Sequence, residues 1–302
     1  MKRTVAICLI LLSAASLAVA AEHQILVTPQ WVAEKLSDPG LVVLQVVSLR
    51  ADYVREHIPG ARMLWQYSIY ESTPDRNSEP LKLPVLDSVL KEVGVNNNSD
   101  IVLCHTLGDL GSVARIYVVL DWLGLGDRTY ILNGGFEAWK AAGLPVTKEI
   151  PTVAKGNFTP RLRPDVFAEL DYVKAHYRDD GVKMVDCRTR QGFDGSGGVN
   201  IYRSGHIPGA VNIPYSVITD TTNHFRPLDS INVKLEEAGI KPTDEVITYC
   251  WVGQASCRHY VALKSLGYKV RLYDGSFEEW SRIDELPVEV TPPKVEEKPK
   301  DN

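Results

Sequence analysis

Short apolar runs alternate with amphipathic stretches along most of the chain. Apolar runs of about four to eight residues between turn signals predict buried strands, and apolar residues spaced three or four apart predict helices. Strands are expected at 41–47, 101–104, 129–132, 182–187, 245–250 and 269–273. Helices are expected at 85–94, 113–124, 136–143, 233–239, 256–267 and 277–282. This alternation predicts an α/β protein whose parallel sheets are flanked by helices on both faces.

The chain contains an internal repeat of three motifs in one order. They are HIPGA at 57–61 and 206–210, NGGFEAW and DGSFEEW at 133–139 and 274–280, and Leu-Pro-Val at 144–146 and 286–288. The separations are nearly constant, at 149, 141 and 142 residues, which indicates two homologous domains. We expect domains at 21–150 and 161–290, a linker at 151–160, and a disordered, charged and Pro-rich tail at 291–302.

The N-terminal segment has the pattern of a secretory signal peptide. Lys2 and Arg3 precede an apolar run, and Ala18-Val19-Ala20 fits a small-x-small cleavage site. The alternative, a membrane anchor, needs a longer apolar run, and no later segment is apolar enough to span a bilayer. We therefore expect residues 1–20 to be removed and the protein to be exported, to the periplasm in a Gram-negative bacterium and otherwise to the medium.

The charge of the remaining chain argues against some partners. Loss of Lys2 and Arg3 leaves 31 basic and 38 acidic residues, a net charge of −7, so no overall attraction for nucleic acid or anionic lipid is expected. The seven histidines are dispersed and no metal-ligand motif or nucleotide-binding loop occurs. We expect no metal and no cofactor, and the sequence does not specify an oligomeric state.

Four cysteines remain after removal of the signal peptide: Cys104, Cys187, Cys250 and Cys257. Two structural disulfides are one interpretation for an exported protein, but a chain of this length buries enough surface without them. We favour at least one functional thiol. Cys257 is expected to be buried and free, and the alternative is a disulfide with Cys250 that would switch the thiol off.

Cys250 is the candidate nucleophile because of its local context. It ends the apolar run 245–249, and ligands of open α/β sheets bind at the carboxyl ends of the strands. Only the thiolate form of cysteine is nucleophilic, and backbone N–H groups and a helix N-terminus both favour it. Ser256 is also a candidate helix cap. The alternative is a structural cysteine. The candidate binding loop comprises Trp251, Val252, Gly253, Gln254, Ala255 and Ser256.

Three segments resemble the rhodanese superfamily. They are GHIPGAVNIPY at 205–215, the cysteine and its glycine-containing loop at 249–256, and LYDGSFEEW at 272–280. The tandem arrangement resembles two-domain sulfurtransferases of the thiosulfate or 3-mercaptopyruvate type, over nearly the whole chain from about Gln24 to Val290. The resemblance implies that Cys250 takes a sulfane sulfur from a small-molecule donor, forms a persulfide, and passes the sulfur to cyanide or a thiol.

The same resemblance implies that the first domain is a non-catalytic copy. Aligning 100–104 with 245–249 places Cys104 over Tyr249 and His105 over Cys250. Gln45 takes the place of Asp186 in this alignment. We therefore expect Cys104 to be a core residue at a strand end, and the alternative is a one-residue slip that brings it into the loop.

Recognition of the donor is expected to come from arginines outside the loop, because the loop carries no charge. Arg188 and Arg203 are the preferred ligands, since a guanidinium binds two oxygens of an anion at once. Asp186 is expected to order a nearby arginine or backbone N–H groups, with Arg258 in support. The basic residue that the family usually carries before the aromatic of this segment falls on Gly192.

Other functions are weighed against this one. Phosphatases of the Cys-x5-Arg type need an arginine six residues after the cysteine, and that position is Ser256. His57 and His206 of the HIPGA motifs are expected to hydrogen-bond backbone and not to act in catalysis. The remaining hypotheses are a thiosulfate sulfurtransferase, a 3-mercaptopyruvate sulfurtransferase, a persulfide carrier without turnover, and a module used only for protein contacts.

Overall fold

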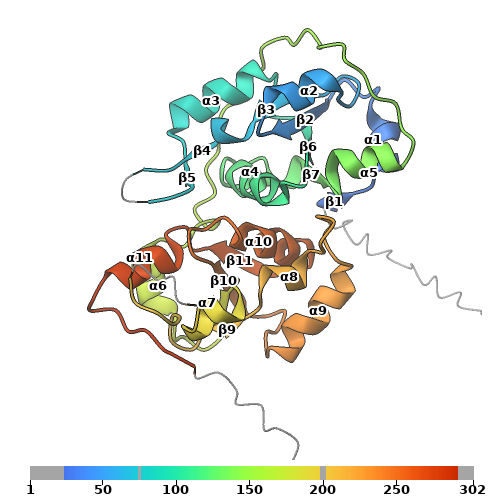
Figure 1. The fold of residues 1–302 in the computed structure, drawn as a ribbon. Coiled ribbons are helices and arrows are strands. Elements are labelled where there is room, and N and C mark those ends of the chain that lie inside the picture. Colours follow the sequence, from blue (N-terminus) through green and yellow to red (C-terminus); the bar gives the residue numbers. More distant parts are fainter. Residues whose placement is uncertain (1–23, 74–75, 198–201, 292–302) are drawn as a thin grey trace, which may run out of the picture.

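The computed structural model describes residues 24–73, 76–197 and 202–291 and contains two α/β domains. The first domain lies above the second in Figure 1, and an extended segment joins them. The predicted signal peptide and nearly all of the predicted tail lie outside the described residues. In the described part of the chain, no helix is long and apolar enough to cross a membrane.

The first domain is built on a parallel sheet of five strands in the order β1-β7-β6-β2-β3. A small antiparallel pair, β4 and β5, extends from it. The strands are β1 (Leu26–Val27), β2 (Leu41–Val47), β3 (Arg62–Trp65), β4 (Tyr70–Glu71), β5 (Glu79–Pro80), β6 (Asp100–His105) and β7 (Thr129–Leu132). The helices are α1 (Pro29–Lys35), α2 (Arg50–Arg55), α3 (Leu83–Glu92), α4 (Leu110–Trp122) and α5 (Gly135–Ala141), with 3-10 turns η1 (Gln66–Ser68) and η2 (Gly126–Arg128).

The second domain repeats this plan with a parallel sheet in the order β11-β10-β8-β9. The strands are β8 (Val182–Asp186), β9 (Val211–Asn212), β10 (Glu245–Tyr249) and β11 (Lys269–Leu272). The helices are α6 (Leu170–His176), α7 (Arg190–Asp194), α8 (Tyr215–Ile218), α9 (Leu228–Glu237), α10 (Ser256–Ser265) and α11 (Ser276–Arg282). The predicted fold class, parallel sheets flanked by helices, is confirmed.

The apolar strands are buried because helices cover both faces of each sheet. In the second domain, Met184 and Ile247 belong to a core cluster on one face, and Val185 and Val246 to a cluster on the other. The second cluster continues across the domain interface, where α4 packs against α10. Helix α4 lies between the two domains (Figure 1) and is buried around nearly its whole circumference, which explains its almost continuous apolar sequence.

The strand register agrees with the alignment of the two domains. Gln45 of β2 pairs with Cys104 of β6, and Asp186 of β8 pairs with Tyr249 of β10. Cys104 is fully buried in the core of the first domain. The prediction that Cys104 is a core residue at a strand end is therefore confirmed.

The repeated motifs of each domain form one local unit. In the first domain His57 forms a backbone bridge with Thr147, next to the Leu-Pro-Val segment, and Trp139 Nε1 donates a hydrogen bond to Pro145 O (2.8 Å). The second domain repeats the bridge between His206 and Glu289. These contacts explain why the three motifs recur together.

The imidazole rings of both HIPGA histidines form hydrogen bonds with backbone carbonyl groups. His57 Nδ1 lies 2.8 Å from the carbonyl oxygen of Tyr53, and His206 Nδ1 lies 2.9 Å from that of Phe193. Each ring also stacks on an aromatic neighbour, Tyr53 or Phe193. The prediction that these histidines bond backbone is confirmed.

The segment predicted as a linker is extended and packs against the first domain. Gly156 N donates to Lys91 O (2.8 Å), and Phe158 N donates to Val95 O (3.3 Å). The Phe158 side chain is 1% exposed. Because backbone hydrogen bonds and a buried aromatic side chain fix this segment on the first domain, it does not act as a free linker.

Candidate active site

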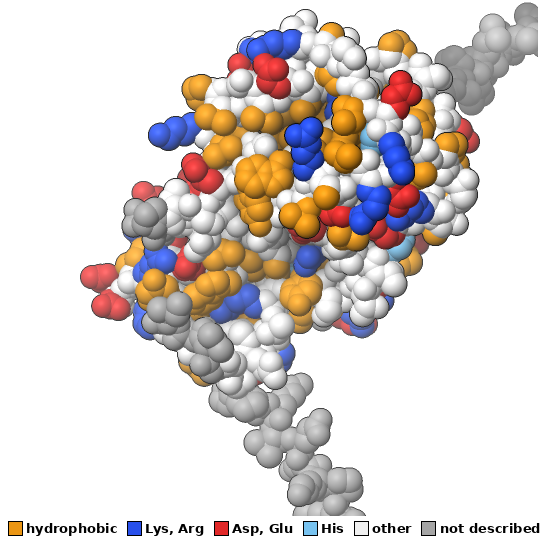
Figure 2. Space-filling view, turned by 45° about the horizontal axis from the view of Figure 1, so that its top comes forward, with side chains coloured by type: hydrophobic (Ala, Val, Ile, Leu, Met, Phe, Trp, Pro, Cys, Tyr) orange, Lys and Arg blue, Asp and Glu red, His pale blue; other side chains and the backbone are white. Residues whose placement is uncertain are grey.

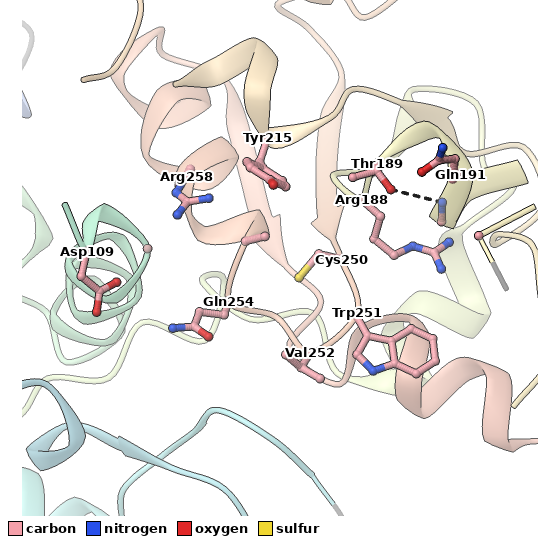
Figure 3. A pocket seen from close by; sticks show the side chains of 14 residues that line it. Asp109, Arg188, Thr189, Gln191, Tyr215, Cys250, Trp251, Val252, Gln254 and Arg258 are labelled. Atoms are coloured by element: carbon pink, nitrogen blue, oxygen red, sulfur yellow. Dashed lines mark hydrogen bonds between the residues drawn. The ribbon is translucent and has the colours of Figure 1, made fainter. Parts of the chain in front are cut away.

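Cys250 follows the last residue of β10, in the middle of the second sheet between β8 and β11. Its side chain is 3% exposed and lines a cavity of about 730 Å³. Figure 3 shows Tyr215 and Arg258 on one side of the sulfur and Arg188 and Trp251 on the other. The space-filling view shows a hollow between the two domains, with basic and hydrophobic side chains at its border (Figure 2). The strand-end position predicted for Cys250 therefore opens onto a cavity.

The backbone at Cys250 is held by the start of helix α11. Cys250 N donates to Ser276 Oγ (3.2 Å), and Cys250 O accepts from Phe277 N (3.1 Å). Trp251 O accepts from Glu278 N (3.0 Å). These three bonds fix the direction in which the chain leaves β10 and enters residues 251–255, which we call the Cys250 loop.

The Cys250 loop presents free backbone donors. Within the described part of the chain, the N–H groups of residues 251–255 have no hydrogen-bond acceptor. Gly253 makes the turn with φ at +77°, a conformation that favours glycine. Helix α10 begins directly after the loop, so its positive end is also directed at this region. Free N–H groups and a helix N-terminus stabilise an anion such as a thiolate or a persulfide.

Ser256 does not act as the predicted helix cap. It is the first residue of α10, and the capping position is Ala255, which makes no side-chain capping bond. The Ser256 hydroxyl is fully buried and donates to Gly253 O (3.1 Å). The bond between Ser256 and Gly253 therefore fixes the conformation of the loop on its buried side. The residues of the loop that line the cavity are Trp251, Val252, Gln254 and Ala255.

Asp186 and Arg188 form a buried pair beside the cavity. Arg188 N and Nε donate to Asp186 Oδ1 (2.9 and 3.0 Å), and the guanidinium also bonds Gly205 O (2.7 Å). The guanidinium carbon lies 4.1 Å from the centre of the Phe277 ring. Burial lowers the pKa of Arg188, but the hydrogen bond and charge of Asp186 outweigh this effect and raise it. Arg188 lines the cavity as a permanent cation, as expected of a donor ligand.

Arg203 is not brought to the cavity, and its predicted role as a donor ligand is not supported. Its guanidinium donates to backbone carbonyls of α11 and the turn after it, at Trp280, Ser281, Ile283, Asp284 and Leu286. It does not line the cavity. The sequence showed that Arg203 precedes the HIPGA turn, but not that the end of α11 presents unpaired carbonyls beside it.

The first domain contributes one wall of the cavity, which the sequence did not predict. Asp109, which caps α4, and Gly111 both line it. Arg258 of α10 faces this wall: a Cβ placed on Gly111 would lie 3.0 Å from Arg258 Nη2. Arg258 also lies over the ring of Tyr215, 5.2 Å from its centre. The remaining lining residues missed from the sequence are Thr189, Gln191, Gly192 and Gly197.

Only one of the four described cysteines lines the cavity. Cys104, Cys187 and Cys257 are completely buried, and all four thiols are free, so the two-disulfide interpretation is wrong for this structure. Cys257 Sγ donates to Gly253 O (3.0 Å). Burial raises the pKa of the Cys257 thiol to about 12. The prediction that Cys257 is buried and free is confirmed.

The first domain has a histidine where the second has its thiol. His105 ends β6 and is 1% exposed. Burial lowers its pKa to about 4, so the imidazole is neutral at physiological pH. Across the described ranges, no group of three or more His, Cys, Asp or Glu side chains is arranged to hold a metal ion.

Comparison with known proteins identifies the family. The model of the rhodanese-like domain matches residues 28–142 and 169–283. A putative thiosulfate sulfurtransferase of Synechococcus elongatus is 32% identical over 283 residues, covering 89% of this chain and 86% of the relative. A probable 3-mercaptopyruvate sulfurtransferase of Pseudomonas aeruginosa is 30% identical over 277 residues, covering 87% of this chain and 97% of the relative.

A solved structure shows the same fold. The match to the crystal structure of YnjE covers 90% of this chain and 70% of the YnjE chain, with a TM-score of 0.78 and 22% sequence identity. The two matched segments hold the repeated motifs, and the second holds Cys250 with its loop. The chain therefore belongs to the rhodanese family, as a sulfurtransferase with two rhodanese-like domains in tandem.

Proposed function

We propose that this sulfurtransferase takes a sulfane sulfur from thiosulfate on Cys250 and transfers it, through a persulfide, to cyanide or to a thiol. The observation that carries the proposal is the cavity at Cys250. It combines one thiol, that of the only described cysteine lining the cavity, with free backbone N–H groups and the guanidinium of Arg188. These groups suit a small dianionic donor and an anionic intermediate.

The first half-reaction loads the enzyme. The Cys250 thiolate attacks the outer sulfur of thiosulfate, the sulfur–sulfur bond breaks, and sulfite leaves with the bonding electron pair. Cys250 then carries a persulfide anion. Its negative charge lies where the loop N–H groups and the first turn of α10 are free to stabilise it.

The second half-reaction unloads it. The carbon of cyanide, or a thiolate, attacks the outer sulfur of the persulfide, and the bond to Cys250 breaks. Thiocyanate or a new persulfide leaves, and the Cys250 thiolate is regenerated. Neither half-reaction needs a metal, a redox cofactor or a general base that acts during the transfer.

Mercaptopyruvate is the second candidate donor. The cavity of about 730 Å³ has room for a larger anion. Arg258 and Tyr215 line its other side, across from Arg188, and give the donor a second cation. The relative from Pseudomonas aeruginosa that carries this name also supports it. Thiosulfate stays our first choice because the Synechococcus elongatus relative, named for it, shares slightly more of the sequence.

The test uses the intact protein and one variant. Incubation with thiosulfate is expected to add about 32 Da, the mass of one sulfur, and dithiothreitol to remove it. The variant Cys250→Ser is expected to take up no sulfur, whereas Cys104→Ser takes up as much as the wild type. Thiocyanate formation with thiosulfate and with mercaptopyruvate then ranks the two donors. Full sulfur uptake by Cys250→Ser would refute the assignment.

Export to the cell envelope is proposed with this function. Support comes from the charged start, the apolar run and the Ala18-Val19-Ala20 site of the N-terminal segment. Expression in a Gram-negative host, followed by fractionation, is expected to yield periplasmic protein that begins near Ala21. Recovery of the full-length chain from the cytoplasm alone would contradict this proposal.

A further inference from the structure

We infer that Arg115, a residue of the first domain, positions the Cys250 loop of the second domain. The inference rests on the proposed role of Cys250 in sulfur transfer. It gives the first domain, which has no thiol at the equivalent position, a part in the reaction. Arg115 acts through Asp274, also hydrogen-bonds Cys257 of α10, and does not line the cavity itself.

Arg115 is a buried cation that crosses the domain interface. It lies on α4 and is 0% exposed, and its guanidinium makes a two-pronged ion pair with Asp274, with Nη2 donating to Oδ2 at 2.9 Å. Nη2 also donates to the carbonyl oxygen of Ser78. A buried charge is strongly unfavourable without a partner. Arg115 therefore holds Asp274 in one place.

Asp274 in turn lies directly beneath the turn of the Cys250 loop. A Cβ placed on Gly253 would come within 2.7 Å of both the backbone oxygen and Oδ1 of Asp274. The loop therefore rests on the carboxylate with no space between them. Since Gly253 O also accepts the thiol hydrogen of Cys257, the buried side of the loop is closed by these contacts.

The residues after Asp274 hold the backbone of the nucleophile. Ser276, Phe277 and Glu278 make the three bonds to Cys250 and Trp251 described above. The first domain also contacts this segment directly, because Asn77 Nδ2 donates a hydrogen bond to the Glu278 carboxylate (2.9 Å). A displaced Asp274 is thus expected to move both ends of the loop.

A second ion pair across the same interface supplies a matched control. Lys264 of α10 pairs with Asp121, near the other end of α4 and away from the cavity. Asp121 also accepts from Tyr260 Oη (2.7 Å) and pairs with Arg163, so it keeps partners when Lys264 is replaced. Arg115→Gln and Lys264→Gln each remove one cation from the interface, but only the first frees the loop.

The experiment compares these variants by single-turnover sulfur loading from thiosulfate, well below the melting temperature of each. We expect Arg115→Gln to load sulfur roughly 10- to 100-fold more slowly at saturating thiosulfate, because displacement by about 1 Å has this effect on reacting groups. The KM for thiosulfate should change little, since Arg188 is untouched. Alkylation of Cys257 in the native protein should accelerate as the loop opens. Lys264→Gln should change neither rate.

Two further variants keep the inference testable. Arg115→Lys retains the charge but loses the two-pronged geometry of the guanidinium, so its rate of sulfur loading should lie between those of the wild type and Arg115→Gln. If Arg115→Gln does not fold, Arg115→Lys is compared with the wild type in its place. The double variant Arg115→Gln, Asp274→Asn removes both charges and should recover stability but not the loading rate. Wild-type loading rates in Arg115→Gln and Arg115→Lys would overturn the inference. Absence of loading at Cys250 in the wild type would instead refute the proposed function.

Discussion

The carboxylate of Asp186 holds both the backbone N–H and the guanidinium of Arg188, and so directs this arginine along the wall of the cavity. In the described part of the chain, Arg188 Nη1 is buried and has no hydrogen-bond partner. An unpaired buried donor on a cation, next to the candidate nucleophile, is the group best suited to bind an oxygen of the donor. The last residue of β8 and the arginine two positions after it thereby supply an anion site.

Arg188→Lys is expected to raise the KM for thiosulfate by roughly 10- to 100-fold, which corresponds to loss of a charged hydrogen bond worth about 1.5–3 kcal/mol. Lysine keeps a charge near Asp186 but does not reproduce the fork. Steady-state kinetics at varied thiosulfate measure the change. Arg203→Gln is the control, because every hydrogen bond that its guanidinium makes to the described residues goes to a backbone carbonyl. The melting temperature should therefore fall while KM stays constant. An unchanged KM in Arg188→Lys would contradict the assignment.

The four thiols are expected to differ sharply in reactivity. Iodoacetamide added to the native, reduced protein should label Cys250 first and label Cys257 only after unfolding, because burial raises the pKa of Cys257 and hides its sulfur. Peptide mass mapping over a time course gives the order. A disulfide between Cys250 and Cys257 in protein purified without reductant would show instead that the pair is a redox switch.

Two buried histidines are expected to contribute a loss of stability between pH 7 and pH 5, which is partly offset by Glu79, whose pKa burial raises to about 7. Burial lowers the pKa of His105 to about 4 and that of His259 to about 3. The unfolded chain binds protons at these positions below about pH 6.5, whereas the folded protein does not. Each histidine should therefore lower the free energy of unfolding by about 2 kcal/mol between pH 7 and pH 5.

Urea unfolding at the two pH values tests this expectation. In His105→Asn and in His259→Gln, the fall in the free energy of unfolding that is attributed to the two histidines should be about half as large as in the wild type. This holds whatever the stability of each variant at pH 7. The exposed His176, which pairs with Asp179, offers a control position where His176→Gln should leave this loss nearly unchanged. Identical pH dependence in the wild type and both buried-site variants would contradict the assignment.

Gly192 offers a test of donor recognition by gain of function. It lines the cavity, and a Cβ placed there would lie 3.2 Å from Cβ of Arg188, a contact that a small shift relieves. Gly192→Arg is expected to lower the KM for thiosulfate by roughly 3- to 10-fold, because a second cation reaches the anion site. Gly192→Glu is the matched variant and should raise it. Equal effects of the two charges would show that position 192 does not face the donor.

The order of motifs along the sequence was sufficient to predict the domain repeat and the place of Cys250. The repeat follows from motifs that recur at a nearly constant separation. The place of Cys250 follows from local information, because an apolar run predicts a strand and ligands bind at the carboxyl ends of parallel strands. The alignment of the two halves also predicted that Cys104 is a core residue near the end of a strand. Cys104 is the second-last residue of β6, and its register with Gln45 agrees with the alignment.

Arg203 shows where this reasoning fails. Its position in the sequence, next to the HIPGA turn, resembled that of a ligand as closely as the position of Arg188 did. The difference lies in what each guanidinium meets after folding: Asp186 for Arg188, and the carbonyls at the end of α11 for Arg203. These carbonyls lie about 80 residues later in the chain, so no local pattern predicted the contact.

The sequence by itself therefore determined the α/β fold and the strand-end thiol, because both depend on patterns within a few residues. It also determined the tandem arrangement, because three motifs recur in one order 141 to 149 residues apart. Only the tertiary structure decided what surrounds that thiol. Asp109 and Gly111 reach the cavity, and Arg115 reaches Asp274, because α4 packs between the domains. Such contacts join residues more than 100 positions apart, and the packing of whole helices sets them.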